Sequence, residues 1–322
     1  AVAGAGLFDC LKSFIIAQKV FDPIIYIQII TLGLHFLWSY LFLNVLHLGV
    51  LGVALCRICE DWTNCALLFI YIKTSGKFDE TFVPWDNNEA FGKEALIKQV
   101  KFTLPMAGVT YFQFIYFDFM VILAGMLGTQ QVVAHLTVSQ TSSSYFFLVL
   151  GLSITSMSLL GNALGERNIQ KAKDVFTKCI HLSYILCMII MLGLSIFKKQ
   201  WYSLWTTDPE TLNLIFTTHI ILILGILPLD SALNSMLAVL KACGKQKTIN
   251  KWTLIGFYCI GVPVTIALVF GLHFEVPGVW FGFFTAYLFM GIIFVRETII
   301  INWKEVVDEI HSRLKSTSYH DL

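Results

Sequence analysis

The sequence predicts an all-helical, polytopic membrane protein with about eight transmembrane helices. Hydrophobic residues make up 57% of the chain and charged residues 13%, about half the charge content of a soluble domain. Several charge-free apolar stretches reach the roughly 17–25 residues that a helix needs to cross a bilayer. They lack the two-residue alternation of barrel strands. Because backbone polar groups in lipid must pair with one another, such stretches form helices.

Turns and charged residues mark the boundaries of the expected spans. The eight spans cover residues 22–45, 48–72, 101–127, 131–160, 175–197, 210–240, 251–272 and 276–299. Three charges interrupt the second span, and Gly128-Thr129 predicts a turn between the third and fourth. Residues 1–16 are apolar apart from Asp9 and Lys12. We interpret them as the tail of a further span, because they lack the basic start and small-residue cleavage site of a signal peptide.

The basic residues predict the orientation of the spans. If the spans alternate in direction, 19 of the 22 Lys and Arg fall on one side of the membrane. Lys198 and Lys199 fall on the other side, and Arg57 lies inside a span. Loops rich in Lys and Arg stay in the cytoplasm. The loops between spans two and three, four and five, and six and seven, together with both tails, are therefore expected to be cytoplasmic.

An internal repeat predicts two similar halves, a common plan of secondary transporters. The copies pair Gln18-Lys19 with Gln246-Lys247, His47 with His273, and Gly52-Val53 with Gly278-Val279, at offsets of 228 to 226 residues. The half that contains the second copy has about 140 residues of expected spans before it, at 101–240. Only 17 residues precede the first copy. We therefore expect a transporter chain that lacks most of its first half.

Asp230 is the sharpest candidate for a functional residue. A charge inside a span costs roughly 2.5–3.5 kcal/mol on insertion scales, so a charge that is kept there suggests a role. Asp230 follows Pro228, which is expected to kink the helix, and Asn234 lies one turn further on the same face. A carboxylate with an amide neighbour beside a helix break predicts a proton or cation site. The alternative is a structural hydrogen-bond anchor.

The third span carries a second set of candidates. Asp118 follows an aromatic run that includes Tyr111. Gln113 lies about 140° around the helix from Asp118, so the two do not share a face. Aromatic rings near a carboxylate suit flat organic cations. The alternative is lipid-facing aromatic packing, with Asp118 near the outer interface.

Three charged residues cluster in the second span. Arg57 can reach Glu60 and Asp61, at spacings of three and four residues along a helix. An ion pair would neutralise these charges. The cluster is therefore interpreted either as structural or as a gating or proton-relay group.

Other chemistry is not indicated by the sequence. The chain has no HExxH or paired-His motif, no second CxxC and no phosphate-binding loop with a Lys-Ser/Thr end. We therefore expect no metal, no cofactor and no ATP-driven or enzymatic activity, and we interpret the cysteines as structural thiols. The expected partners are small organic substrates and the lipid bilayer, without nucleic acid.

Three segments resemble one family of transporters. Residues 151–173 contain the Gly-Asn-x-Leu-Gly turn that leads into a basic loop, residues 237–268 contain a Cys-Gly turn followed by Gln-Lys, Tyr and Gly-x-Pro, and residues 14–23 read FIIAQKVFDP. In this order they resemble the multidrug and toxic compound extrusion (MATE) family, in its eukaryotic branch. The resemblance implies twelve helices in two six-helix lobes, of which this chain would hold helices five to twelve.

The resemblance also implies a domain plan. Residues 1–72 would be the end of the first lobe, 73–100 a cytoplasmic linker, 101–300 the second lobe and 301–322 a cytoplasmic tail. Within the tail, apolar residues recur at helical spacing at Val306, Val307, Ile310 and Leu314. This pattern predicts either an amphipathic helix on the membrane surface or a solvated tail.

The resemblance assigns roles to several of the candidate residues. Asp230 matches an Asp of helix ten that lines the second-lobe cavity, and Tyr258 matches a tyrosine of helix eleven that faces it. Gln113 stands where the family has an acidic residue on helix seven, while a slightly later acidic position is kept as Asp118. The family offers no account of the charged cluster in the second span.

The implied function is export of organic, in expectation cationic, compounds by proton-coupled antiport, with Na⁺ as the less favoured coupling ion. One alternative is a lipid or lipid-oligosaccharide flippase of the same superfamily. Another is a truncated membrane protein that transports nothing. A monomer is expected if the protein is full length, and a partner chain if it is truncated. The membrane is expected to be the plasma membrane or that of a vacuole or vesicle, with a cytoplasmic C-terminus.

Overall fold

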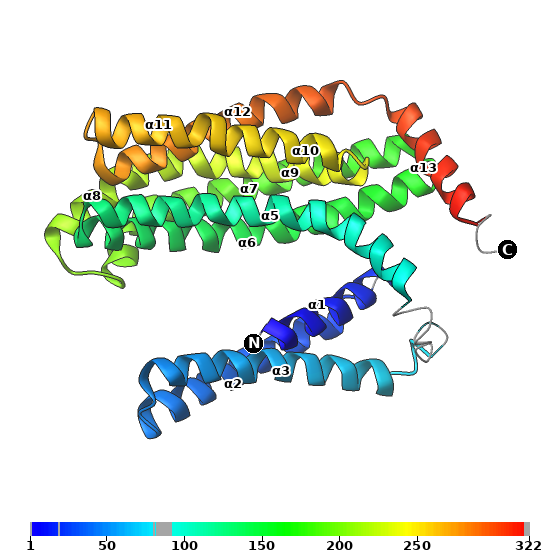
Figure 1. Ribbon diagram of the computed structural model, residues 1–322, viewed down its shortest axis with the longest axis horizontal. Helices are drawn as coiled ribbons and strands as arrows, with labels where there is room; N and C mark the ends of the chain where they lie inside the picture. The colour runs from blue at the N-terminus through cyan, green and yellow to red at the C-terminus, as the bar shows by residue number, and fades with distance from the viewer. Residues whose placement is uncertain (1, 19, 80, 82–91, 319–322) are drawn as a thin grey trace. The chain divides into compact units, whose positions relative to one another are not determined.

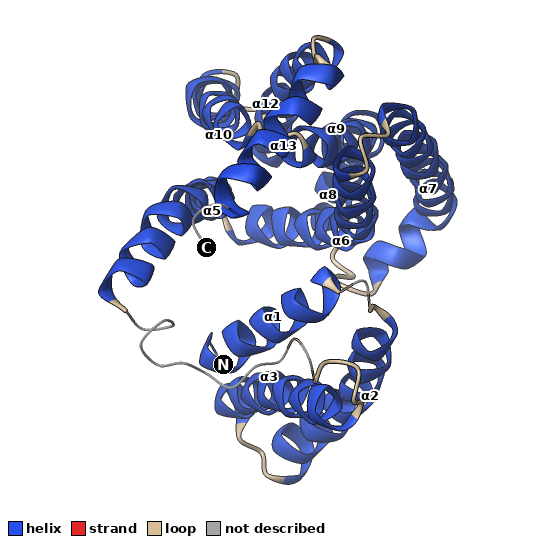
Figure 2. Ribbon diagram, turned by 90° about the vertical axis from the view of Figure 1, so that its right-hand side faces the viewer, coloured by secondary structure: helices blue, strands red, loops and turns tan. Residues whose placement is uncertain are grey.

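The computed structural model describes residues 2–18, 20–79, 81 and 92–318. All regular structure in these residues is helical (Figure 2), so the predicted fold class is confirmed. The chain divides into two compact units, Ala1–Leu96 and Ile97–Leu322. The predicted linker at 73–100 lies in part outside the described residues.

The described residues of the first unit form mainly α1 (Val2–Ala17), α2 (Asp22–Ser39) with its π-helical extension η1 (Tyr40–Val45), and α3 (Gly49–Thr74) (Figure 1). Their buried apolar side chains form one small core that contains Phe8, Ile15, Ile24, Ile27, Leu68, Ile72 and Phe78. The apolar segment expected at residues 1–16 is thus a helix packed against α3.

The second unit holds the remaining helices. In chain order they are α5 (Lys93–Leu127), α6 (Thr129–Gly165), α7 (Ile169–Ser203), α8 (Pro209–Ile221), η2 (Leu222–Ile226), α9 (Leu227–Ala242), α10 (Gln246–Leu254), η3 (Ile255–Gly261), α11 (Val262–Ile266), η4 (Ala267–Gly271), α12 (Glu275–Ile299) and α13 (Trp303–Ser318). The consecutive elements α8, η2 and α9 form one span, and those from α10 to η4 form another. A large apolar core joins these helices and is centred on α6, α9 and α12.

Helices occupy all eight predicted spans. Among the described residues, six helices are long and apolar enough to cross a membrane. The other two predicted spans are α3 and α5. Arg57, Glu60 and Asp61 lower the hydropathy of α3, and α5 contributes a shorter apolar segment, Tyr111–Leu127. The chain is therefore an integral, multi-pass membrane protein.

Two prolines lie close to π-helical segments of the second unit. Pro228 is the second residue after the end of η2, and Pro263 lies between η3 and η4. Proline has no N–H, and its ring excludes the carbonyl four residues before it. A wider π-turn accommodates this loss without ending the helix. The irregularity expected at Pro228 thus takes the form of a π-helical turn, η2, that ends one helical turn before Asp230.

The sequence repeat reappears as a repeated turn. After η1, Leu46 N donates to Leu41 O and Leu48 N donates to Phe42 O; after η4, Leu272 N donates to Ala267 O and Phe274 N donates to Leu268 O. Left-handed backbone occurs at His47 and Gly49 in one copy (φ 50° and 53°) and at His273 and Glu275 in the other (φ 55° and 52°). Both copies therefore fold the same helix-to-helix connection.

This turn predicts opposite effects for two substitutions. A left-handed conformation costs about 1–2 kcal/mol for a residue with a Cβ atom and little for glycine. Replacing Glu275 by Gly is therefore expected to raise the free energy of unfolding by about 1 kcal/mol, and replacing Gly49 by Ala to lower it by a similar amount. Thermal unfolding of the two variants in detergent measures both. Equal effects of the same sign would contradict the prediction.

Asp208 caps the N-terminus of α8. Its carboxylate accepts hydrogen bonds from the Thr211 hydroxyl (2.6 Å) and the Thr211 N–H (2.9 Å). The hydroxyl contributes most and the N–H next, and together they hold the pKa of Asp208 below its ordinary value. A lowered pKa means that this cap stabilises the folded state above the ordinary pKa of about 3.9, and that its contribution fades as the pH falls below it.

Replacing Asp208 by Ala is expected to lower the unfolding midpoint by about 2–4 °C at neutral pH. The difference in unfolding midpoint between the variant and the wild type should shrink as the pH falls below 4. The Asp208 carboxylate of the wild type then becomes protonated and loses its advantage over Ala as a cap. Asp208→Asn retains a capping oxygen and serves as the control. Thermal scans of the three proteins at neutral and acidic pH test this, and a pH-independent difference would contradict it.

The C-terminal segment forms the helix α13. Val306 and Val307 are buried, and Trp303 and Ile310 pack against the core of the second unit. The side chain of Leu314 lies outside the described residues. The predicted apolar stripe therefore packs against the protein itself, at the end of α6. This differs from both expected arrangements, which were a helix on the membrane surface and a solvated tail.

Candidate functional site

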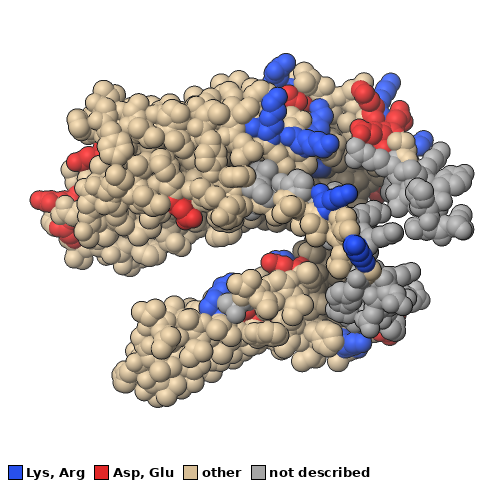
Figure 3. Space-filling view, viewed as in Figure 1, with Lys and Arg blue, Asp and Glu red and all other residues tan. Residues whose placement is uncertain are grey.

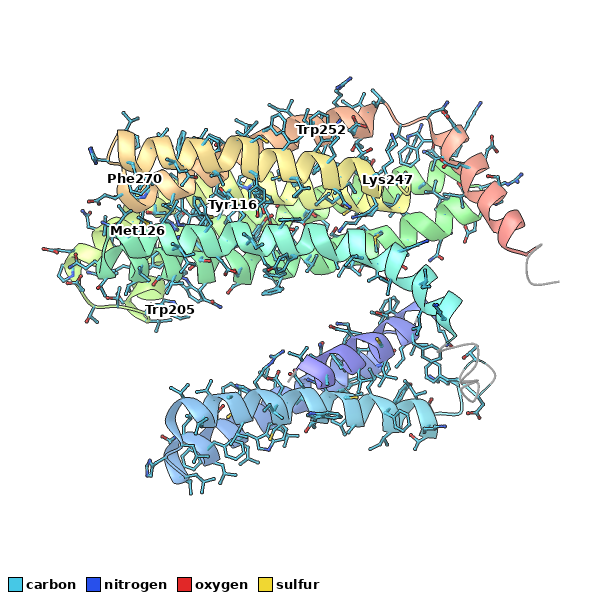
Figure 4. All side chains as sticks on the ribbon, in the orientation of Figure 1. Tyr116, Met126, Trp205, Lys247, Trp252 and Phe270 are labelled. Carbon is cyan, nitrogen blue, oxygen red and sulfur yellow. The ribbon has the colours of Figure 1, made fainter. Side chains whose placement is uncertain are left out.

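A cavity of about 120 Å³ lies inside the second unit, between α5, α6, α9, α10–η3 and α12. Its walls are Gln113, Phe146, Asp230, Leu233, Asn234, Leu237, Lys241, Gln246, Ile249, Asn250, Thr253, Phe257, Tyr287, Met290 and Phe294. Tyr116 of α5, labelled in Figure 4, lies among the helices that enclose it. Its ring centroid is 4.6 Å from that of Phe257 and 6.1 Å from that of Phe283. An aromatic wall thus backs the polar groups.

Asp230 is the charged centre of this cavity. Its residue is 4% exposed, and Asn234 Nδ2 lies 3.1 Å from Asp230 Oδ1 and 3.0 Å from the Asp230 carbonyl oxygen. Tyr287 of α12 lines the cavity beside it. The second carboxylate oxygen, Oδ2, is buried and accepts no close hydrogen bond from the described residues; the Tyr287 hydroxyl interacts with the carboxylate from a longer distance. A buried acceptor without a close donor is costly, so Oδ2 favours a proton or a cationic ligand.

A network of hydroxyl groups on α6 and α7 forms hydrogen bonds with α9. Tyr145 of α6 donates a hydrogen bond to the Leu227 carbonyl (3.2 Å) and contacts the Ser231 hydroxyl. Ser153 donates to the Asn234 carbonyl at 2.8 Å. Further along, Ser235 donates to the Ser183 hydroxyl of α7 at 3.3 Å. These bonds fix the helix on both sides of Asp230, so the carboxylate is presented by a rigid element.

The cavity also contains groups that the sequence patterns did not single out. Lys241 brings a positive charge to the wall. It lies eleven residues after Asp230 on the same helix, a rise of about 16 Å. Gln246 and Asn250 line the same end, and Gln246 Nε2 donates to Asn250 Oδ1 at 2.9 Å. Little in the sequence signals them, because all three fall in the Lys-rich loop predicted between the spans 210–240 and 251–272, where polar residues are ordinary.

The structure separates the predicted site residues into two groups. Asp230, Asn234 and Gln113 line the cavity together. Asp118 is exposed on α5. The Tyr258 hydroxyl donates a hydrogen bond of 2.5 Å to the Phe112 carbonyl oxygen. Neither of these two lines the cavity. Tyr258 instead ties η3 to α5.

The charged cluster of the second span lies in the first unit. Arg57 contacts Glu60 Oε2 at 3.4 Å and Asp61 Oδ1 at 3.2 Å. His35 Nδ1 of α2 lies 3.2 Å from Glu60 Oε2. The expected ion pairs therefore form, and the His35 ring lies beside them. Asp61 is buried where α1 approaches: a Cβ built on Gly4 would lie 3.3 Å from the Asp61 Cβ. A gating or proton-relay role for the cluster stays a prediction.

Comparison with known proteins gives the relatives of this chain. The family model MatE matches residues 105–267. Protein DETOXIFICATION 15 of Arabidopsis thaliana is 28% identical over 323 residues, which cover 97% of this chain and 64% of the relative. Human multidrug and toxin extrusion protein 1 is 26% identical over 318 residues, covering 98% and 55%. The crystal structure of the eukaryotic MATE transporter AtDTX14 matches with a TM-score of 0.85 at 20% identity, covering 95% of this chain and 68% of that one.

A multi-pass helical bundle that encloses a buried carboxylate among amide and aromatic side chains is an arrangement typical of membrane transport proteins. The matched family model and the relatives make the assignment specific: the chain belongs to the MatE family, the multidrug and toxic compound extrusion transporters. This confirms the family resemblance of the sequence. The chain spans 55–64% of the length of these two relatives.

Proposed function

We propose that the protein exports organic cations by alternating access and that the cavity around Asp230 is the substrate site. The observation that carries this proposal is the buried Oδ2 of Asp230, which has no close hydrogen-bond donor among the described residues, in a cavity that Gln113 and Asn234 also line. Relatives named for multidrug and toxin extrusion support export as the direction of transport. The approximate fit of an aromatic wall to flat organic cations supports the substrate class.

Proton exchange at Asp230 provides the coupling step. In the ionised form, the carboxylate attracts a cationic substrate, and Asn234 keeps Oδ1 hydrogen-bonded so that Oδ2 points to the ligand. A proton that enters from the outside neutralises the carboxylate and removes this attraction. Substrate is then released, and the conformation that binds the proton is favoured over the one that binds the substrate.

Lys241 sets where the cation sits. Its ammonium group repels a like charge, so the positive group of the substrate belongs at the Asp230 end of the cavity. Polar or negative substituents are accommodated toward Lys241, Gln246 and Asn250. Lys241 is the one cationic side chain among the described residues that line the cavity, which does not favour the flippase alternative, because a lipid-linked oligosaccharide would call for a wide cationic cavity.

The coupling ion is tested with imposed gradients. Vesicles that contain the protein are loaded with a fluorescent organic cation, and efflux is followed under a proton gradient or under a sodium gradient of equal size. Proton coupling predicts that only the first drives export, and that a protonophore abolishes it. Export driven by sodium and insensitive to the protonophore would refute proton coupling.

We further propose that the end of the second unit that carries α13 faces the cytoplasm. On the face shown in Figure 3, the Lys and Arg side chains of this unit gather toward that end, together with some acidic side chains, whereas the charged side chains visible at the opposite end are acidic. This is the charge distribution that cytoplasmic loops carry. The membrane is expected to be the plasma membrane or that of a vacuole or vesicle.

A further inference from the structure

A second hollow lies on the outside of the second unit, between the C-terminal part of α7 and the span α8–η2. It has a volume of about 200 Å³ and is lined by Ser195, Lys198, His219, Ile220, Ile223 and Leu224. It shares no lining residue with the Asp230 cavity. We call it the α7–α8 groove.

One side of the groove is polar. Lys198 is exposed, and within the described residues no carboxylate lies within 4 Å of its ammonium group. The ammonium nitrogen lies 5.4 Å from the centroid of the Phe216 ring, which places it over α8. A cation at this position is available for an external anion.

His219 contributes a second polar group. It is 5% exposed, and its Nδ1 lies 2.8 Å from the hydroxyl of Tyr202, which is fully buried. When Tyr202 donates its hydrogen to Nδ1, the neutral ring carries its own hydrogen on Nε2. That N–H is then a donor held at the wall of the groove. Ser195 adds a hydroxyl on the α7 side.

The other side of the groove is aliphatic and open. Ile220 is 58% exposed and Leu224 is 72% exposed. On α7, the preceding side chains of Ile189, Leu192 and Ile196 are also exposed. In a protein that spans a membrane, aliphatic side chains in such positions face the acyl chains of lipids.

The groove lies at the depth of the lipid headgroups. Trp201 and Trp205 follow Lys198 within seven residues, at the end of α7, and Trp205 is 51% exposed (Figure 4). Tryptophan concentrates at the membrane–water interface, where headgroups meet the hydrocarbon region. A cation just inside a tryptophan, above an aliphatic wall, therefore lies at the level of lipid phosphates.

We propose that the α7–α8 groove binds an anionic membrane phospholipid. Lys198 contacts the phosphate, Ser195 and His219 donate hydrogen bonds to it, and the start of an acyl chain lies against Ile220 and Leu224. The charge pattern of the sequence places this groove on the side opposite the cytoplasm, where Lys198 and Lys199 are the predicted cations. The aliphatic wall favours a lipid over a free anion, because a free anion gains nothing from exposed Ile and Leu.

The chain offers a matched control for this site. Lys199 is the next residue, has the same charge and is also exposed, but it does not line the groove. Lys198→Gln, Lys199→Gln and Lys198→Arg are purified as full chains in a neutral detergent. Phosphatidylglycerol, phosphatidylcholine or inorganic phosphate is titrated into each, and binding is followed by native mass spectrometry and by the unfolding midpoint.

Phosphatidylglycerol is expected to bind the wild-type protein, Lys199→Gln and Lys198→Arg with similar affinity. Lys198→Gln should bind it about tenfold more weakly, since it loses one charge-assisted contact. An equal effect of both Gln variants, or no effect of either, would overturn the site. Equal binding of phosphatidylcholine would overturn the preference for anionic lipid, and equal protection by inorganic phosphate would overturn the assignment to a lipid.

Discussion

Replacing Asp230 by Asn is expected to reduce proton-driven export of organic cations by about 10- to 100-fold. The amide keeps the shape of the side chain and an oxygen that can accept the hydrogen bond from Asn234, which lies 3.1 Å from Oδ1 in the wild type. It cannot ionise, so it loses the charge-assisted contact with the substrate, whose loss costs about 1.5–3 kcal/mol. It also cannot exchange a proton, and any remaining transport should be insensitive to the proton gradient.

Efflux of a fluorescent cation from vesicles measures this effect, with the amount of protein in the membrane determined in the same samples. Asp118→Asn is the matched control, since it makes the same chemical change at an exposed position that does not line the cavity. The control should export at close to the wild-type rate. If Asp230→Asn exports at the full, gradient-dependent rate, the proposed mechanism is wrong. If Asp118→Asn is the variant that fails, the coupling group lies on α5 instead.

Gly282→Ala is expected to destabilise the second unit by about 2–4 kcal/mol. A Cβ at this position of α12 would lie 1.9 Å from Thr265 Oγ1 and 2.9 Å from Thr265 Cα on α11. Thr265 is fully buried, and its hydroxyl donates to the Gly261 carbonyl at 2.7 Å. Rotating the hydroxyl away would break that bond, and the contact with the backbone would remain. The two helices must therefore move apart.

Two other glycines serve as comparison positions for this prediction. A Cβ on Gly256 would meet the flexible side chain of Met290, with 2.7 Å to its Cγ, whereas a Cβ on Gly161 would meet nothing within 4 Å. The loss of thermal stability should therefore be largest for Gly282→Ala, intermediate for Gly256→Ala and absent for Gly161→Ala. Unfolding midpoints measured in one detergent give the order. A midpoint of Gly282→Ala at or above that of Gly161→Ala would show that α11 and α12 do not pack this closely.

Local sequence patterns were sufficient for the helices and for the central residue of the site. Length, lack of charge and the cost of unpaired backbone in lipid determine that these segments are helices, so all eight predicted spans are helical. The repeat around His47 and His273 reappears as the same turn because identical local hydrogen bonds close it. Asp230 was identified because a charge in an apolar span is costly wherever the span lies.

Helical periodicity also separated Gln113 from Asp118, which lie on different sides of α5, but it could not say which side faces the cavity. That choice depends on the helices that pack against α5. The sequence likewise could not show that the Tyr258 hydroxyl donates its hydrogen bond to the Phe112 carbonyl instead of facing the cavity. A side chain on a helix can be placed on a face from the sequence, whereas its neighbour is fixed only when two helices pack.

The sequence by itself determined the class of the protein, its spans, its repeat and the buried carboxylate. Only the tertiary structure decided which groups share a cavity with Asp230. Lys241 and Tyr287 join it, and Tyr145 supports its helix across a contact between α6 and α9 that joins residues more than 80 positions apart. The physical reason is that hydropathy and helix formation are local, whereas the partner of a buried polar group comes from whichever distant helix packs against it.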